Sequence, residues 1–74
     1  MFEFEYFNGE HHIIFDIIEV DNDKKQITLA VSNQGKIIEE TFDLLQDKKD
    51  NNRQYFEYGL YIDKLYLDEF IYKE

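Results

Sequence analysis

The chain has 74 residues, of which 17 are acidic and 8 are basic, and its net charge is −9. This balance excludes direct binding to nucleic-acid phosphates or to an anionic membrane surface, because both need clusters of Lys and Arg; a basic protein is the partner that complements it. There is no Cys, which excludes disulfides and Cys-based metal sites and fits a cytoplasmic location.

The length predicts a single domain over residues 1–74 with a thin core, because a chain of this size buries only about 60% of its unfolded surface. Seven Phe and six Tyr can supply that core or an interface. No apolar run approaches the roughly 20 residues that span a bilayer. The first residues are acidic where a signal peptide is basic. We therefore expect a soluble protein with no membrane contact.

The first half of the chain is predicted to form three strands joined by short turns. Met1–Phe7 is predicted to be a strand, because Phe2, Phe4 and Tyr6 alternate with Glu3 and Glu5; Phe7 breaks the polar face at its end. Asn8-Gly9 is a strong hairpin signal because both residues tolerate positive φ. Ile13–Val20 is the densest apolar run, and it is predicted to be the central strand with both faces largely covered. A polar turn over Asp21–Lys25, a strand over Gln26–Ser32 and a turn ending at Gly35 follow.

Lys36–Leu45 permits two interpretations. As a strand it places Ile38, Phe42 and Leu44 on one face, with Glu40 as a polar defect; as a helix it also forms an apolar stripe. The preceding Gly turn suits a hairpin and favours the strand.

The last third is predicted to hold a loop and two strands. Gln46–Arg53 is the loop, because it is almost free of apolar residues. Tyr55–Ile62 alternates as a strand, Asp63-Lys64 is a candidate tight turn, and Leu65–Tyr72 is a further strand. A terminal helix that starts at Asp63 is the alternative for this last segment.

These elements predict an all-β fold, an antiparallel meander of about six strands that forms a bent sheet or a small barrel. An α+β fold with one helix near residues 36–48 or at the C-terminus is the alternative.

No set of residues predicts catalysis or metal binding, so we expect a protein that is not an enzyme and has no cofactor. His11 and His12 are adjacent and point to opposite faces of a strand, and the only Ser is Ser32, beside a turn. Glu10 with the two His residues offers zinc ligands that do not converge. Asp21-x-Asp23 begins like a calcium loop, but Lys25 stands where a third oxygen ligand is needed.

Carboxylates on strand faces are the most specific feature of the sequence. Glu3 and Glu5 share a face and lie about 6.5–7 Å apart along a strand, and Glu39 and Asp43 continue such a face if residues 36–45 form a strand. A row of this kind can imitate the phosphates of a nucleic acid, whose rise is about 3.4 Å per nucleotide. Exposed carboxylates also serve solubility alone. Tyr55, Glu57 and Tyr61 are expected on the outer face of a later strand as an aromatic and acidic patch.

We therefore predict a small acidic binding protein, an inhibitor that occupies a basic surface of a nucleic-acid-handling partner. Its expected contact residues are Glu3, Glu5, Glu39, Asp43, Tyr55, Glu57 and Tyr61. The composition, which is rich in Lys, Asn, Ile, Asp and Tyr, suggests an AT-rich genome. A small acidic domain without an active site is also of the type that a phage or mobile element can use against a host enzyme, so we expect that setting. The alternative is a structural module that self-associates, as a homodimer or in a larger assembly, through aromatic strand faces.

Overall fold

The computed structural model describes residues 2–59 and 62–72, and these residues confirm the all-β prediction. The strands are β1 (Phe2–Phe7), β2 (His12–Asp21), β3 (Gln26–Asn33), β4 (Lys36–Asp43), β5 (Leu45–Asp47), β6 (Arg53–Tyr58), β7 (Ile62–Tyr66) and β8 (Ile71–Tyr72). A single 3₁₀ turn, η1 (Leu67–Glu69), precedes β8 and is the only helical segment among the described residues. It is far too short to cross a membrane.

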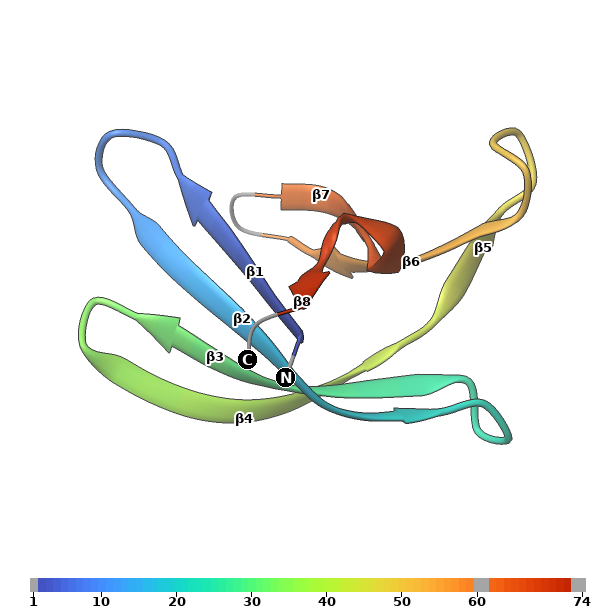
Figure 1. Ribbon diagram of the computed structural model, residues 1–74, viewed down its shortest axis with the longest axis horizontal. Helices are drawn as coiled ribbons and strands as arrows, with labels where there is room; N and C mark the ends of the chain where they lie inside the picture. The colour runs from blue at the N-terminus through green and yellow to red at the C-terminus, as the bar shows by residue number, and fades with distance from the viewer. Residues whose placement is uncertain (1, 60–61, 73–74) are drawn as a thin grey trace.

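The strands form two antiparallel sheets (Figure 1). The larger sheet has five strands in the order β4-β3-β2-β1-β8, and the smaller has three in the order β5-β6-β7. The larger sheet is strongly curved, and the smaller sheet covers its concave side. The chain returns at its end, because β8 pairs with β1 through Phe2 opposite Tyr72 and Glu3 opposite Ile71.

Alternate residues of the strands build the core between the two sheets. Ile13 and Phe15 of β2 point inward together with Ile27, Leu29 and Val31 of β3, and they meet Leu44, Phe56, Leu65 and Phe70 from the rest of the chain. Phe56 is fully buried and its ring lies 5.1 Å from the ring of Phe42 and 6.2 Å from that of Phe15. Aromatic side chains therefore join the sheets, as a thin core of few residues requires.

The turns use side-chain acceptors as much as glycine. Gly9 has a φ of 92°, but Asn8 does not share this conformation; its Oδ1 instead accepts hydrogen bonds from the backbone N–H groups of Glu10 (3.0 Å) and His11 (2.7 Å). The loop thus spans four residues between Phe7 and His12, and not the two of a tight Asn-Gly hairpin. A two-residue turn does occur at Gln34 and Gly35, whose φ values of 53° and 80° are typical of type I′.

The strand predicted over Ile13–Val20 is central, as expected, but only one of its faces is covered. β2 is the middle strand of the five, but only its inner residues are covered by the smaller sheet. Ile18 on the other side is half-exposed, next to a bulge between Ile17 and Glu19. Residues 36–43 form a strand, so the helix alternative for this segment is wrong. Ile38, Glu40 and Phe42 share its inner face, as the alternation predicted.

The last third differs most from the prediction. Residues 55–62 are not one strand, because Tyr58 pairs with Ile62 across a hairpin turn. Asp63 and Lys64 lie inside β7 and form no turn. The segment from Leu65 onward is broken by η1, and no helix begins at Asp63. A period of two in the sequence continued across both breaks and concealed them.

Candidate functional site

The outer face of the five-stranded sheet is the candidate functional surface, because the smaller sheet covers only the inner face. Residues that pair across antiparallel strands share a face. Glu3 pairs with Asp16, Asp16 with Ala30, and Ala30 with Glu39, so the three carboxylates and one Ala form a row across β1 to β4. Three inter-strand spacings of about 4.8 Å separate the ends of this row.

Further carboxylates lie on the same face in neighbouring rows. The register places Glu5 on β1, Glu19 and Asp21 on β2, and Asp43 on β4 there. Within the described residues, no Lys or Arg occupies an outer-face position of β1 to β4. The outer face therefore presents negative charge from β1, β2 and β4, with the uncharged outer positions of β3 between them. Glu39 and Asp43 form no ion pair with a described residue.

Apolar side chains lie among these carboxylates. Phe7 is 68% exposed, Ile37 is 74% exposed and Ile71 is 69% exposed. Pairing places Phe7 beside His12 on the outer face and Ile71 beside Glu3, at the edge of the carboxylate row. Acidic groups around exposed aliphatic side chains are typical of a protein-binding surface, since the apolar area supplies affinity and the charge supplies selection.

The two histidines have different polar neighbours. His12 Nε2 lies 2.6 Å from Glu5 Oε1 on the exposed outer face, and the His12 ring packs edge-on against Phe7. His11 Nδ1 lies 3.3 Å from Gln34 Nε2. No group of three His, Cys, Asp or Glu residues with a metal-binding arrangement is present in residues 2–59 and 62–72.

The predicted contact residues divide between two separate regions. Glu3, Glu5, Glu39 and Asp43 lie together on the outer face of the larger sheet, where the alternation placed them. Tyr55 belongs to the smaller sheet, where its ring lies 5.5 Å from the ring of Tyr66 and 5.0 Å from Lys64 Nζ.

The remaining two residues add little to either region. Glu57 is exposed and, with Asp43, lines a shallow hollow between β4 and β6 that includes Thr41 and Leu45. Tyr61 lies outside the described residues. The expected aromatic and acidic patch is therefore divided, because Tyr55 packs against Tyr66 within the smaller sheet, whereas Glu57 borders Asp43 of the larger sheet.

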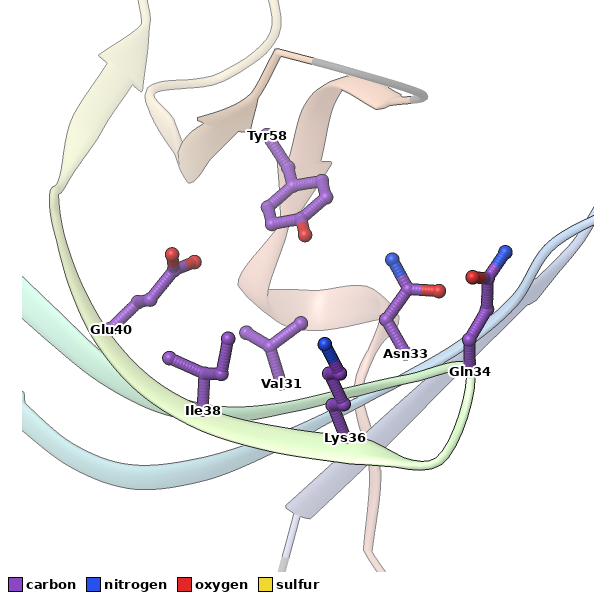
Figure 2. A pocket seen from close by; sticks show the side chains of 7 residues that line it. All are labelled: Val31, Asn33, Gln34, Lys36, Ile38, Glu40 and Tyr58. Carbon is purple, nitrogen blue, oxygen red and sulfur yellow. The ribbon is translucent and has the colours of Figure 1, made fainter.

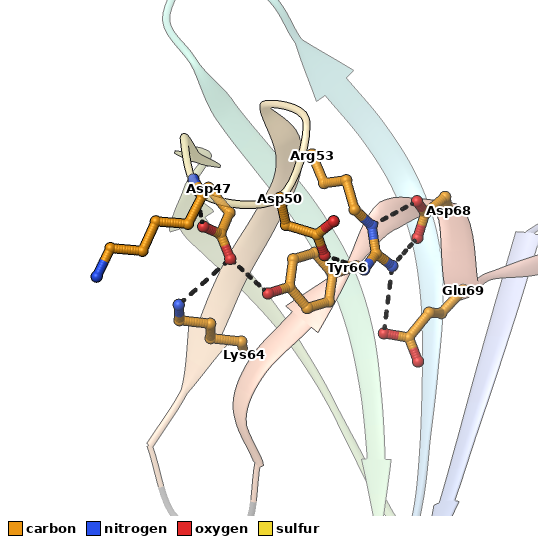
Figure 3. A network of polar contacts seen from close by, with 8 residues as sticks. Asp47, Asp50, Arg53, Lys64, Tyr66, Asp68 and Glu69 are labelled. Carbon is orange, nitrogen blue, oxygen red and sulfur yellow. Dashed lines mark hydrogen bonds and ion pairs between the residues drawn. The ribbon is translucent and has the colours of Figure 1, made fainter.

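Sequence reasoning missed a network of paired charges on the smaller sheet (Figure 3). Arg53 lies at its centre: Nε and Nη2 donate to the two carboxylate oxygens of Asp68 at 2.8 and 2.6 Å, and Nη1 donates to Asp50 at 2.7 Å. The guanidinium also lies 3.8 Å from the ring centre of Tyr66. The hydrogen bonds to Asp68 and to Asp50 raise the pKa of Arg53, and the hydrogen bonds from Arg53 hold the pKa of Asp68 below its usual value.

Asp47 anchors the other side of this network. The Tyr66 hydroxyl donates to Asp47 Oδ2 at 2.7 Å, and Lys64 Nζ lies 3.5 Å from the same oxygen. The hydrogen bond from Tyr66 lowers the pKa of Asp47, and it raises the pKa of Tyr66 in turn. The loop predicted over residues 46–53 is therefore shorter, because Gln46 and Asp47 belong to β5 and Arg53 begins β6; only residues 48–52 connect the two strands.

A small pocket of about 230 Å³ lies on the inner side of β4, where the two sheets diverge (Figure 2). Val31 and Ile38 form its floor, Tyr58 points into it from β6, and Lys36 and Glu40 flank it. Asn33 also lines it, and its Oδ1 is buried without a hydrogen-bond partner among the described residues. The pocket therefore combines an apolar floor with the polar side chains of Lys36, Glu40 and Asn33.

Comparisons with protein-family models, with curated proteins and with solved structures gave no match. The candidate function therefore depends on the geometry and charge of the chain itself.

Proposed function

We propose that this protein is a small acidic binding protein that occupies a basic surface of a nucleic-acid-handling partner and inhibits it. The single observation that carries the proposal is the outer face of the five-stranded sheet, which presents carboxylates from β1, β2 and β4 and no Lys or Arg at its described positions. Such a face attracts a basic groove at long range and repels acidic proteins.

The spacing of the carboxylates supports competition with a nucleic acid. Glu3 and Glu5 lie two residues apart on one strand, about 6.5–7 Å, and Asp16 lies next to Glu3 on the neighbouring strand. Carboxylates at such intervals can contact Lys and Arg residues that otherwise hold successive phosphates. The exposed Phe7 and Ile71 add apolar area at the margin of this charge.

Self-association through aromatic strand faces is less well supported. The rings of Phe4, Phe15, Phe42 and Phe56 contact other rings within the chain, so these aromatic side chains contribute to the core and not to an interface. A basic partner, by contrast, would complement the excess of acidic over basic residues in this chain. The biological setting that we propose is inhibition of a host enzyme by a phage or mobile element.

The test is affinity capture from a bacterial lysate with tagged wild-type protein and two charge-reversal variants. Glu3→Lys with Glu5→Lys changes the outer face; Asp23→Lys with Asp63→Lys makes the same change of net charge at exposed positions in a turn and on β7. We expect the wild type and the control to capture a basic nucleic-acid-binding protein that elutes as salt rises or as duplex DNA is added. The outer-face variant should lose it. Equal capture by both variants, or capture that resists DNA, would contradict the proposal.

A further inference from the structure

We propose that β4 pairs with β4 of a second copy of this chain, in antiparallel orientation about a two-fold axis that passes beside Ile38. The two five-stranded sheets then continue into one sheet across the axis. This inference concerns self-association and does not depend on the proposed function, because it uses the edge of the sheet and not its outer face.

β4 is the longest open edge among the described strands. It lies at the end of the order β4-β3-β2-β1-β8 and has eight residues, whereas β8 at the other end has two. Residues 36–41 are all exposed. Its pairing with β3 runs without a register shift, so no bulge turns the edge away from a new strand.

The hairpin fixes which backbone groups are available. In a two-residue turn the flanking residues, here Asn33 and Lys36, form a hydrogen-bonded pair, and such pairs alternate along the ladder. The N–H and C=O groups of Ile37, Glu39, Thr41 and Asp43 are therefore directed to the open edge. An added antiparallel strand can bond to them without any change in β4.

The side chains of β4 indicate that the added strand is β4 of a second copy, because they complement an identical strand. Ile38 is 55% exposed on the inner face, and Lys36 and Glu40 flank it two residues away on each side. With the axis beside Ile38, Ile38 meets the partner's Ile38, and each Lys36 lies opposite the partner's Glu40. Ile37 then lies opposite the partner's Glu39, and their outward backbone groups form hydrogen-bonded pairs.

Other registers are worse. A shift of the axis to Glu39 or Glu40 places two identical carboxylates directly opposite each other, which destabilises a strand pair. A shift to Ile37 leaves only three residues of each strand in contact. Within one chain, Lys36 and Glu40 have no ion pair with a described residue. Both line the open pocket beside Ile38 (Figure 2), so the second strand covers an apolar edge and pairs both charges.

The experiment is analytical ultracentrifugation of the whole chain over a wide concentration range. We expect a mass of two chains at high concentration, and we expect Lys36→Glu or Glu40→Lys alone to weaken the dimer about tenfold, because each change creates like-charged pairs on both sides of the axis. The double variant Lys36→Glu with Glu40→Lys exchanges the charges and should restore the wild-type dissociation constant.

A backbone variant supplies an independent check. Glu39→Pro removes an N–H group directed to the open edge, so it should abolish the dimer while the far-ultraviolet circular dichroism of the monomer is retained. A mass of one chain at millimolar concentration would overturn the proposal. So would a dimer that the single charge reversals leave unchanged, or a double variant that fails to restore association.

Discussion

Both sheets carry carboxylates on their outward faces, but the two sets of carboxylates differ in whether they are paired within the chain. On the smaller sheet, Asp47, Asp50 and Asp68 each contact a cation or a hydroxyl, and Arg53 serves two of these carboxylates. On the larger sheet, Glu39 and Asp43 form no ion pair with a described residue, and the outer face that they share with Glu3 and Asp16 has no Lys or Arg at its described positions. The first face pairs its carboxylates within the chain, and the second leaves Glu39 and Asp43 available to a basic partner.

The difference shows that acidic composition alone does not locate a binding surface. The carboxylates that close the loop after β5 are acidic residues in a strongly acidic protein, yet their contacts are structural. Pairing within the chain separates the two roles, because a carboxylate that already accepts from Arg53 has less to offer a basic partner.

Truncation of a core side chain between the two sheets should have the largest effect on stability. Phe56→Ala deletes a fully buried ring in contact with both sheets, and it is expected to lower the free energy of unfolding by about 3–5 kcal/mol. Chemical denaturation measures this. The matched control is Phe7→Ala on the exposed outer face, for which we expect a change within about 0.5 kcal/mol. Similar losses in both variants would mean that the core does not lie between the sheets.

Arg53→Gln should have the next largest effect, through the charge network of the smaller sheet. The change removes the bonds to Asp50 and Asp68 and the contact with the Tyr66 ring, so we expect a Tm several degrees lower. Arg53→Lys should recover only part of the loss, because an ammonium group cannot bind Asp68 through two parallel bonds. Full recovery by Lys would show that charge alone matters. Capture of the partner should not change in either variant.

Low pH should reduce the stability of the protein, and part of this loss should depend on the Asp68 carboxylate. Because Arg53 lowers the pKa of Asp68 below 3.8 in the folded protein, this carboxylate stabilises the fold above that pH, and the contribution is lost as pH falls through the lower folded value. Asp68→Asn should be less stable than wild type at neutral pH and lose less stability between neutral pH and strong acid. Denaturation midpoints measured across this range test it; parallel curves would contradict it.

Neutral substitutions on the larger sheet should have the smallest effect on stability. Glu39→Gln with Asp43→Asn removes two exposed carboxylates that form no ion pair with a described residue, so we expect a change within about 0.5 kcal/mol. Binding of the basic partner should weaken and become less dependent on salt. A large loss of stability would mean that this face is structural, like that of the smaller sheet.

Much of the larger sheet could be predicted from the sequence. Alternation predicted strands over residues 1–7, 26–32 and 36–45, and the structure has strands over residues 2–7, 26–33 and 36–43. The alternation also correctly placed Glu3, Glu5, Glu39 and Asp43 on outward positions. The smaller sheet could not be predicted in the same way. The alternation of Phe56, Tyr58 and Ile62 continued through a hairpin, because residues on both sides of the turn face the same core.

The sequence by itself determined the period of two, the sign of the charge and the positions of several turns, because each depends on neighbouring residues. Only the tertiary structure decided that Asp16 lies between Glu3 and Ala30, that Arg53 meets Asp68, and that β4 remains an open edge while β8 pairs with β1. These features depend on which distant strands pair, and pairing is selected by burial of the whole set of inward side chains together, which no local pattern contains.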